Sequence, residues 1–439
     1  MKRALSRWFA DYGMVLVLFL LCAFFSVATY TEQSATGEVA AVQVGELIKK
    51  QFGGNALVVI AVREQAEDVA FAKRLNAELI ASGARVLAVI QGEPKDAREA
   101  LMKIVATGGK LHAIACTQAT SEWEVFSDLK TDFPSLGEPV LLAPLRYRWP
   151  IFLNASNLLN IANQIAVIAV IAIGMTLVIV TGGIDLSVGS LIALSAVLAA
   201  KMIRDCAGGM NATASGMIIA CIAAVLLCGA IGAFSGGMIT QFGIPPFIVT
   251  LAMMLVCSGL AFTLAEGQSI AEIPDSFMWL GRGADLLGLP NAVVLMVALY
   301  VLAHVLMSRT KLGRYLYAVG GNREAARLSG VPVQRVLMFA YIASALLAGL
   351  GGVFMASLYK SGSATYGNMY ELYVIAAVVV GGASLSGGEG KMFGTFIGAL
   401  TIAVIQNGMN LTNVESYTQK VVLGLVILGA VLLDKIRHR

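Results

Sequence analysis

The segment Ser384–Lys391 (SLSGGEGK) contains the residue types that come closest to catalytic chemistry in this sequence. A Ser hydroxyl and glycine amides can bind a nucleotide phosphate when they begin a helix. Hydrolysis also needs a second loop, G-x-x-x-x-G-K-[ST], whose amides and lysine surround the phosphates. Only Lys110 and Lys391 follow a glycine, and neither has the upstream glycine or the following Ser or Thr. We therefore predict that the chain does not hydrolyse ATP and is not an enzyme.

The same segment includes LSGGE, which differs in one residue from LSGGQ, the signature peptide of the ATPase subunits of ABC transporters. A comparison with Thr181–Gly189 (TGGIDLSVG) explains it better. At a constant offset of 199 positions, identical residues pair as Gly182 with Gly381, Gly183 with Gly382, Leu186 with Leu385, Ser187 with Ser386 and Gly189 with Gly388. We interpret the match as an internal repeat of the kind that many transporters contain. Chance identity in a glycine-rich chain is the alternative.

Paired glycines end a helix or let two backbones approach closely, and a following Ser or Asp can cap the next helix. We therefore expect a helix break or a place on the translocation pathway at Gly182, Gly183, Asp185, Ser187, Gly381 and Gly382. Asp185 has two interpretations. It contacts the solute or transmits motion, or it caps the next helix or pairs with a basic loop.

Amide side chains form two sets with the spacing i, i+3 and i+4, which places each set on one face of a helix. The sets are Asn160, Asn163 and Gln164, and Gln406, Asn407 and Asn410. Amides offer donors and acceptors without a fixed charge, which suits a neutral, hydroxylated solute. We predict that both sets line a pathway; hydrogen bonds between helices are the alternative.

The composition indicates a membrane protein, since 58% of the 439 residues are hydrophobic and 13% are charged. We predict a polytopic α-helical membrane protein with about ten transmembrane helices, each of roughly 20 apolar residues. The expected spans are 11–30, 161–181, 187–203, 214–235, 246–265, 291–308, 336–358, 371–384, 392–411 and 417–434.

Lys and Arg accumulate in cytoplasmic loops and therefore predict the orientation. Three basic clusters fall on one side if ten spans cross: Lys2, Arg3 and Arg7; Arg309, Lys311, Arg314, Arg323, Arg327 and Arg335; and Lys435, Arg437 and Arg439. Both termini are then cytoplasmic, the net charge of +4 reflects orientation, and we expect no nucleic-acid partner. Ser26-Val27-Ala28 after an apolar stretch also resembles a signal-peptide cleavage site, but an uncleaved first span gives the even count that the C-terminal charges require.

A stretch of soluble composition separates the first two spans and divides the chain into 1–45, 46–148 and 149–439. Short apolar runs at 56–62, 85–90, 111–116 and 139–143 alternate with helical patterns at 64–81, 95–106 and 121–129. This alternation predicts a small α/β domain with a parallel sheet. His112 fits a packed or surface residue, and neither the histidines nor the six cysteines show metal-ligand spacing. The domain is a docking platform or a reduced ligand-binding lobe, or it is a structural insertion.

Several ordered motifs resemble the ribose-type sugar permeases of ABC importers. They are TGGIDLSVGS at 181–190, GGNREAARLSGVPVQRV at 320–336 and VVVGGASLSGGEGKMFGTFIGA at 378–399. The resemblance covers about 150–439. It implies a multi-pass protein of the bacterial inner membrane in which two permease subunits, a homodimer or two similar chains, form the pathway. Separate ABC subunits bind ATP, and the permease itself binds no cofactor. A soluble solute-binding protein delivers a monosaccharide. The 46–148 domain departs from the family pattern and puts the docking of that protein in doubt.

The loop 309–335 is the longest and most basic one on the inside, and EAARLSG within it predicts a short helix that ends at Gly330 before Pro332. An exposed short helix can sit in a groove of an ATPase and pass its movement to the spans. We predict that Glu324, Ala325, Ala326, Arg327 and Gly330 couple the chain to the ATPase. The alternative is a solvated loop that serves only orientation.

Two other functions remain open. An ion-coupled secondary transporter usually needs carboxylates within the membrane, and the predicted spans offer little beyond Asp185. A receptor would use the outer domain to sense a ligand, but ten spans exceed what signalling requires.

Overall fold

The computed structural model describes residues 2–286 and 288–437, with side chains for 13–286 and 288–432. The chain forms two compact units. One is Tyr30–Pro150, here called the inserted unit, and the other joins 1–29 with 151–439 and is called the membrane unit. Six of the basic residues that predict the orientation have side chains outside the described residues, namely Lys2, Arg3, Arg7, Lys435, Arg437 and Arg439.

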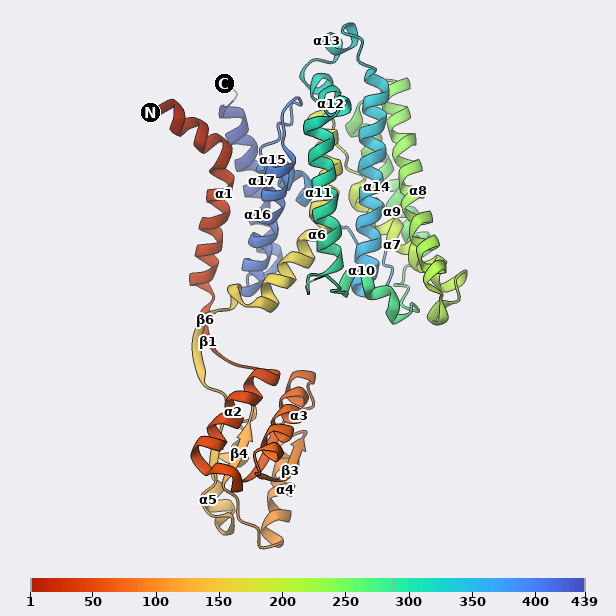
Figure 1. Cartoon of the computed structure of the whole chain (residues 1–439). Coiled ribbons are helices and arrows are strands. Elements are labelled where there is room, and N and C mark those ends of the chain that lie inside the picture. Colours follow the sequence, from red (N-terminus) through yellow and green to blue (C-terminus); the bar gives the residue numbers. More distant parts are fainter. Residues whose placement is uncertain (1, 287, 438–439) are drawn as a thin grey trace. The chain divides into compact units, whose positions relative to one another are not determined.

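The described part of the membrane unit is a bundle of helices (Figure 1). Its helices are α1 (Lys2–Ala28), α6 (Ala155–Val180), α7 (Val188–Asp205), α8 (Ala214–Gln241), α9 (Pro246–Leu264), α10 (Trp279–Arg282), α11 (Asn291–Arg309), α12 (Lys311–Gly321), α13 (Arg323–Leu328), α14 (Val333–Tyr359), α15 (Tyr370–Val380), α16 (Met392–Leu411) and α17 (Ser416–Arg437). The start of α1 and the end of α17 lie at the same end of the bundle as α13 (Figure 1). We call it the α13 end.

Six of the described helices are long and apolar enough to cross a membrane: α6, α8, α9, α11, α14 and α16. The unit is therefore a polytopic helical membrane protein. The other four predicted spans coincide with α1, α7, α15 and α17, and the count of ten crossings stays a prediction.

Of the ten helices that coincide with predicted spans, the one at 371–384 is the shortest. Helix α15 has 11 residues, which is about 16 Å of helix and about half of a hydrocarbon core. The preceding residues 361–369 are irregular and run along α7: a methyl group added at Gly362 would collide with Ala200, and one at Gly367 would collide with Gly189. Irregular backbone at this depth is tolerated where protein surrounds it. The predicted span 371–384 therefore holds one short helix, with irregular residues before it and a turn after it.

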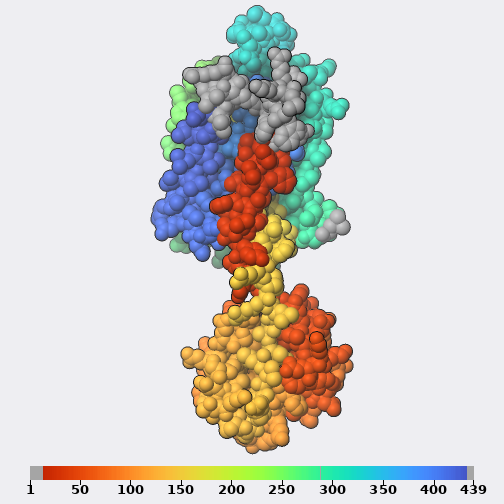
Figure 2. All heavy atoms as spheres, turned by 90° about the vertical axis from the view of Figure 1, so that its left-hand side faces the viewer, coloured from red at the N-terminus to blue at the C-terminus, as the bar shows by residue number. Residues whose placement is uncertain are grey.

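Helix α1 packs against α16 through one aromatic side chain. Phe25 is buried, and its ring fills the space above Gly408, where a methyl group would overlap it. The ring also stacks on Phe152, with centroids 6.1 Å apart. Figure 2 shows α1 in red alongside the C-terminal part of the chain in blue.

The inserted unit contains a parallel sheet and an antiparallel ribbon. The sheet has the order β3 (Arg85–Gln91), β2 (Leu57–Val62), β4 (Ala113–Cys116) and β5 (Val140–Leu142), and the ribbon pairs β1 (Tyr30–Ser34) with β6 (Arg146–Pro150). Its helices are α2 (Gly37–Phe52), α3 (Ala66–Ala81), α4 (Pro94–Ala106) and the short α5 (Leu129–Asp132). Alternate residues of β2 enter two cores: Val58 and Ile60 pack with α2 and α3, while Val59 and Ala61 pack with α4. Helices therefore cover both faces of the sheet.

The inserted unit covers more residues than the range 46–148 expected from composition. It begins at Tyr30 because α2 buries Ala40, Val44 and Ile48 in the core. The helix expected at 121–129 is instead a 3₁₀ turn at Glu124–Phe126 followed by α5.

Two chemically suggestive side chains of this unit are structural. His112 accepts a hydrogen bond at Nδ1 from the Leu57 amide at 2.9 Å, and its ring stacks on Phe52. Burial in β4 raises the pKa of the Cys116 thiol to about 12, so the group stays protonated at neutral pH.

Candidate functional site

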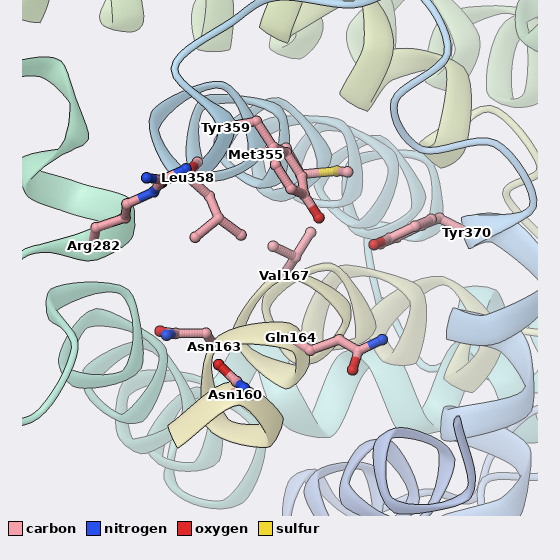
Figure 3. A pocket seen from close by; sticks show the side chains of 9 residues that line it. All are labelled: Asn160, Asn163, Gln164, Val167, Arg282, Met355, Leu358, Tyr359 and Tyr370. Carbon is pink, nitrogen blue, oxygen red and sulfur yellow. Dashed lines mark hydrogen bonds between the residues drawn. The ribbon is translucent and has the colours of Figure 1, made fainter. Parts of the chain in front are cut away.

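A cavity of about 300 Å³ lies between α6, α10, α14 and α15 (Figure 3). Its lining residues are Asn160, Asn163, Gln164, Val167, Arg282, Met355, Leu358, Tyr359 and Tyr370. All three amides predicted on α6 are among them, because their spacing places them on one face of the helix. Tyr359 is the last residue of α14, so the cavity lies toward the end opposite α13.

The lining offers hydrogen bonds and apolar ring faces together. The hydroxyl ends of Tyr359 and Tyr370 point toward the middle of the cavity, near Val167 (Figure 3). The amide oxygen of Asn163 is buried and has no hydrogen-bond partner. An unpaired buried acceptor costs about 1–3 kcal/mol, and a hydroxyl group of a bound solute would satisfy it. The lining residues include an arginine, Arg282, and no carboxylate.

The second amide set, on α16, does not line this cavity. Asn407 exchanges two hydrogen bonds with Asn157 of α6, at 2.8 and 3.1 Å. Gln406 is buried with its amide oxygen unpaired, and Asn410 is exposed and accepts a hydrogen bond from Gln419. The alternative of hydrogen bonding between helices therefore describes Asn407, because this face of α16 is turned toward the first turn of α6.

Both predicted glycine breaks follow the end of a helix. After α6 the amide of Gly183 bonds to Val178 O at 3.0 Å, and Gly182 has φ +76°. After α15 the amide of Ala383 bonds to Val378 O at 3.1 Å, and Gly382 has φ +88°. This is one capping geometry, repeated at a separation of 200 positions rather than 199. Gly182 thus corresponds in conformation to Gly382, while the sequence identity pairs it with Gly381.

Asp185 connects three elements at the first break. Its Oδ1 accepts hydrogen bonds from the Ser187 amide at 3.0 Å and the Ser187 hydroxyl at 2.6 Å, just before α7. Its Oδ2 accepts one from the Ser344 hydroxyl of α14 at 2.8 Å. The side chain is buried and does not line the cavity. No side-chain hydrogen bond among the described residues caps the first turn of α7 itself, so Asp185 ties the residue before α7 to α14, and its predicted roles remain predictions.

A second carboxylate, Glu371, was not among the predicted site residues. It lies in the first turn of α15 and packs against Gly189 near the start of α7, where a methyl group would collide with its carboxylate. Glu371 is the first residue of the span predicted at 371–384. Among the described residues, no group of three His, Cys, Asp or Glu side chains could hold a metal ion.

The predicted coupling residues lie on and just after α13, which projects from the bundle (Figure 1). Asn322 caps this helix by accepting a hydrogen bond from the Ala325 amide at 2.9 Å, and Gly330 has φ +82° beyond its end. Glu324 and Arg327 form an exposed ion pair at 3.0 Å.

The exposure of two side chains of α13 bears on the predicted coupling role of this helix. Ala326 is 5% exposed and packs α13 onto the bundle, so it is not available to a partner. Leu328 is 81% exposed and was not predicted. The sequence signal that could have found it is an apolar residue within a short, polar helix. We call Glu324, Ala325, Arg327 and Leu328 the coupling surface.

Comparisons with known proteins agree with this architecture. The model of the permease component of branched-chain amino acid transport systems matches residues 157–431. The ribose import permease protein RbsC of Escherichia coli (strain K12) is 42% identical over 299 residues, which cover 67% of this chain and 90% of the relative. RbsC of Bacillus subtilis (strain 168) is 42% identical over 304 residues, or 69% and 92%.

A more distant relative is the L-arabinose transport system permease protein AraH of Escherichia coli (strain K12), 35% identical over 290 residues, or 66% of this chain and 86% of the relative. No solved structure matches the chain. The family match starts after the inserted unit, which therefore lies outside it. These findings confirm the resemblance to ribose-type permeases. The chain belongs to the family described as the permease component of branched-chain amino acid transport systems.

Proposed function

We propose that the chain is the membrane-spanning subunit of an ATP-driven ABC importer that carries a monosaccharide or a similar polar solute across the bacterial inner membrane. The observation that carries the proposal is the pairing of a polar cavity near one end of the bundle with an exposed, capped helix, α13, at the other. The first can admit a solute, and the second can receive movement from a separate ATPase.

The cavity favours a neutral sugar over an amino acid. A free amino acid carries an ammonium group, and the lining offers Arg282 but no carboxylate to pair with it. Amides and tyrosine hydroxyls instead supply the donors and acceptors that a hydroxylated ring needs. The relatives are named for ribose, D-allose and L-arabinose. The α6 amides Asn160, Asn163 and Gln164 are our candidates for solute contact.

The orientation follows from the basic residues at the α13 end. Arg309, Lys311, Arg314, Arg323, Arg327 and Arg335 gather there, and cytoplasmic loops carry such an excess. Both termini are then cytoplasmic. The chain leaves the membrane unit at Thr29 and re-enters it at Ile151, beyond α1 and before α6. The inserted unit is therefore extracytoplasmic, where it serves as a docking platform or a ligand-binding lobe.

The partners follow from the relatives and from the surface of the chain. Two ATP-binding subunits bind the coupling surfaces of two permease subunits, which are the same or similar chains. A soluble protein delivers the solute. ATP is bound by the partner subunits, and this chain holds no cofactor of its own.

An ion-coupled carrier is the second candidate, because Glu371 adds a carboxylate beside α7. Uptake by the assembled complex in sealed vesicles separates the two. An ATP-driven importer transports when an uncoupler is present, whereas an ion-coupled carrier stops even when ATP is supplied.

The coupling surface is tested by two substitutions, Glu324→Lys and Leu328→Asp. Both side chains are exposed, so insertion and folding are expected to be unchanged. We expect each variant to lose most of its co-purified ATPase subunit and at least tenfold of its uptake, because a reversed charge or a buried carboxylate disrupts the docked surface. Co-purification and sugar uptake are the measurements.

Glu272→Lys is the matched control, since it makes the same charge reversal on an exposed side chain beyond α9, toward the opposite end. It should leave ATPase binding unchanged. Full binding and full uptake by both α13 variants would show that the ATPase does not dock at this surface.

A further inference from the structure

The loop 384–391, which contains the peptide similar to the ATPase signature, binds two helices of its own chain. The amide of Gly388 donates a hydrogen bond to Val180 O at 2.8 Å and so satisfies a carbonyl at the end of α6. The hydroxyl of Tyr317, on α12, donates a hydrogen bond to Gly390 O at 2.5 Å. One loop therefore joins the end of α6 to α12.

Backbone contacts make this joint tight. A Cβ atom added at Gly320 of α12 would overlap Val180 O and would lie 2.5 Å from the Gly388 amide nitrogen. A Cβ atom added at Gly387 would lie 2.9 Å from Gly320 O and 3.0 Å from the Gly182 nitrogen. We call Gly182, Gly320, Gly387 and Gly388 the glycine junction. Because backbones touch directly, no side chain can change rotamer to absorb a displacement between α12 and α6.

One side of the junction leads to the coupling surface. Helix α12 ends at Gly321 and α13 begins at Arg323, so only Asn322 separates them. The Asn322 amide bonds to Ala318 O of α12 at 3.1 Å, and its side chain caps α13 at 2.9 Å. A displacement of α13 must therefore act on α12.

The other side of the junction leads to the first helix break. Gly182 lies three positions before Asp185, whose carboxylate bonds to Ser187 before α7 and to Ser344 of α14. Movement of the α6 end thus reaches α7 and α14, which pack on each other. Contacts between α13 and the break are continuous through α12, the loop 384–391 and the end of α6.

We propose that the glycine junction transmits the ATPase-driven movement of α13 to the break between α6 and α7, with Gly320 and Tyr317 as positioning residues. This inference rests on the proposed function. In this proposal the loop 384–391 holds α6 and α12 together. Its glycines are required because the backbones touch there, and not because they bind a nucleotide.

The test compares Gly320→Ala with Gly321→Ala in the complete transporter, assembled with its ATPase subunits in sealed vesicles. The control is matched in chemistry and position, because a Cβ atom at Gly321 would meet no atom within 4 Å. The readout is the sugar taken up per ATP hydrolysed, with ribose, allose and arabinose as probes. We expect Gly320→Ala to hydrolyse ATP while this ratio falls at least tenfold, and Gly321→Ala to match the parent.

Tyr317→Phe provides a second test that adds no bulk. It removes only the hydroxyl that bonds to Gly390 O, and we expect the ratio to fall several-fold. A parental ratio in Gly320→Ala overturns the proposal. If Gly320→Ala does not assemble, Tyr317→Phe decides, and a parental ratio in that variant overturns it. Loss of ATP-dependent uptake in the unsubstituted complex would instead overturn the proposed function, and this inference with it.

Discussion

Asn163 is our main candidate for direct contact with the solute. Its amide oxygen is buried beside the cavity and lacks a partner. Asn163→Leu removes the unpaired acceptor with little change in volume, so the stability of the empty protein should be unchanged or slightly higher. A lost hydrogen bond to a solute hydroxyl is worth about 1.4 kcal/mol, or roughly tenfold in affinity. We therefore expect the KM for sugar uptake to rise about tenfold.

Asn410→Leu is the control for this prediction, because Asn410 is exposed and lies outside the cavity lining. The measurements are uptake kinetics and thermal unfolding of both variants. Equal KM values for the two variants would show that Asn163 does not contact the solute.

Residue spacing predicted part of the cavity and could not predict the rest. The α6 amides lie within one helix, so periodicity alone places them on one face. Arg282, Tyr359 and Tyr370 come from three other elements, and only the packing of those elements brings them to α6. Asn407 shows the same limit, since its partner Asn157 is 250 positions away.

At the scale of elements, apolar runs located the helices but not their ends: α8 continues to Gln241, beyond the predicted 235, and α15 stops at Val380, before the predicted 384. Residues 374–380 are apolar, and the small residues 381–383 that follow do not mark the end of α15 in a hydropathy pattern. The glycine pair does mark it, because Gly382 adopts a positive φ of +88° just beyond the helix. Residues 37–45 of the amphipathic α2 lie before the predicted start of the domain at 46, because the core partners of Val44 and Ile48 come from a sheet that begins later in the chain.

The contact between α1 and α16 bears on whether α1 remains in the mature protein. Phe25 lies directly above Gly408, so Gly408→Leu would force the two helices apart. Such overpacking costs about 1–3 kcal/mol, and we expect a lower midpoint of thermal unfolding in detergent. Retention of α1 in the purified protein, shown by intact mass, is the accompanying expectation.

Gly424→Leu on α17 is the matched control, because a Cβ atom there would meet no atom within 4 Å. It should unfold at the parental temperature. A parental midpoint for Gly408→Leu as well would show that α1 does not pack against α16 in the folded protein.

At the scale of the whole molecule, the insertion can be removed without separating the helices that flank it. The Ile151 amide donates a hydrogen bond to Thr29 O at 3.0 Å, and the Phe152 amide bonds to the Thr29 hydroxyl at 3.1 Å. A short Gly-Ser linker can therefore replace Tyr30–Pro150. We expect the shortened chain to insert and to bind its ATPase subunits, while solute delivery falls. Uptake equal to that of the full chain would assign the inserted unit a purely structural role.

The two units differ in how well the sequence predicted them. Motifs along the membrane unit predicted its family, and the family match at 157–431 covers the residues that carry these motifs. The inserted unit has no such motif. Its short apolar runs located β2, β3, β4 and β5, while its boundaries depend on the ribbon and α2, whose partners are distant in the chain.

The central claim is that this chain conducts a sugar and that a separate ATPase moves it through α13. The most direct measurement is ribose, allose and arabinose uptake into vesicles that contain the purified chain and are supplied with the soluble solute-binding protein, with and without the ATPase subunits, ATP and an uncoupler. The account predicts uptake only when the subunits and ATP are both present, insensitivity to the uncoupler, and no ATP hydrolysis by the chain alone. Uptake without ATP that the uncoupler abolishes, or ATP hydrolysis by the isolated chain, would contradict it.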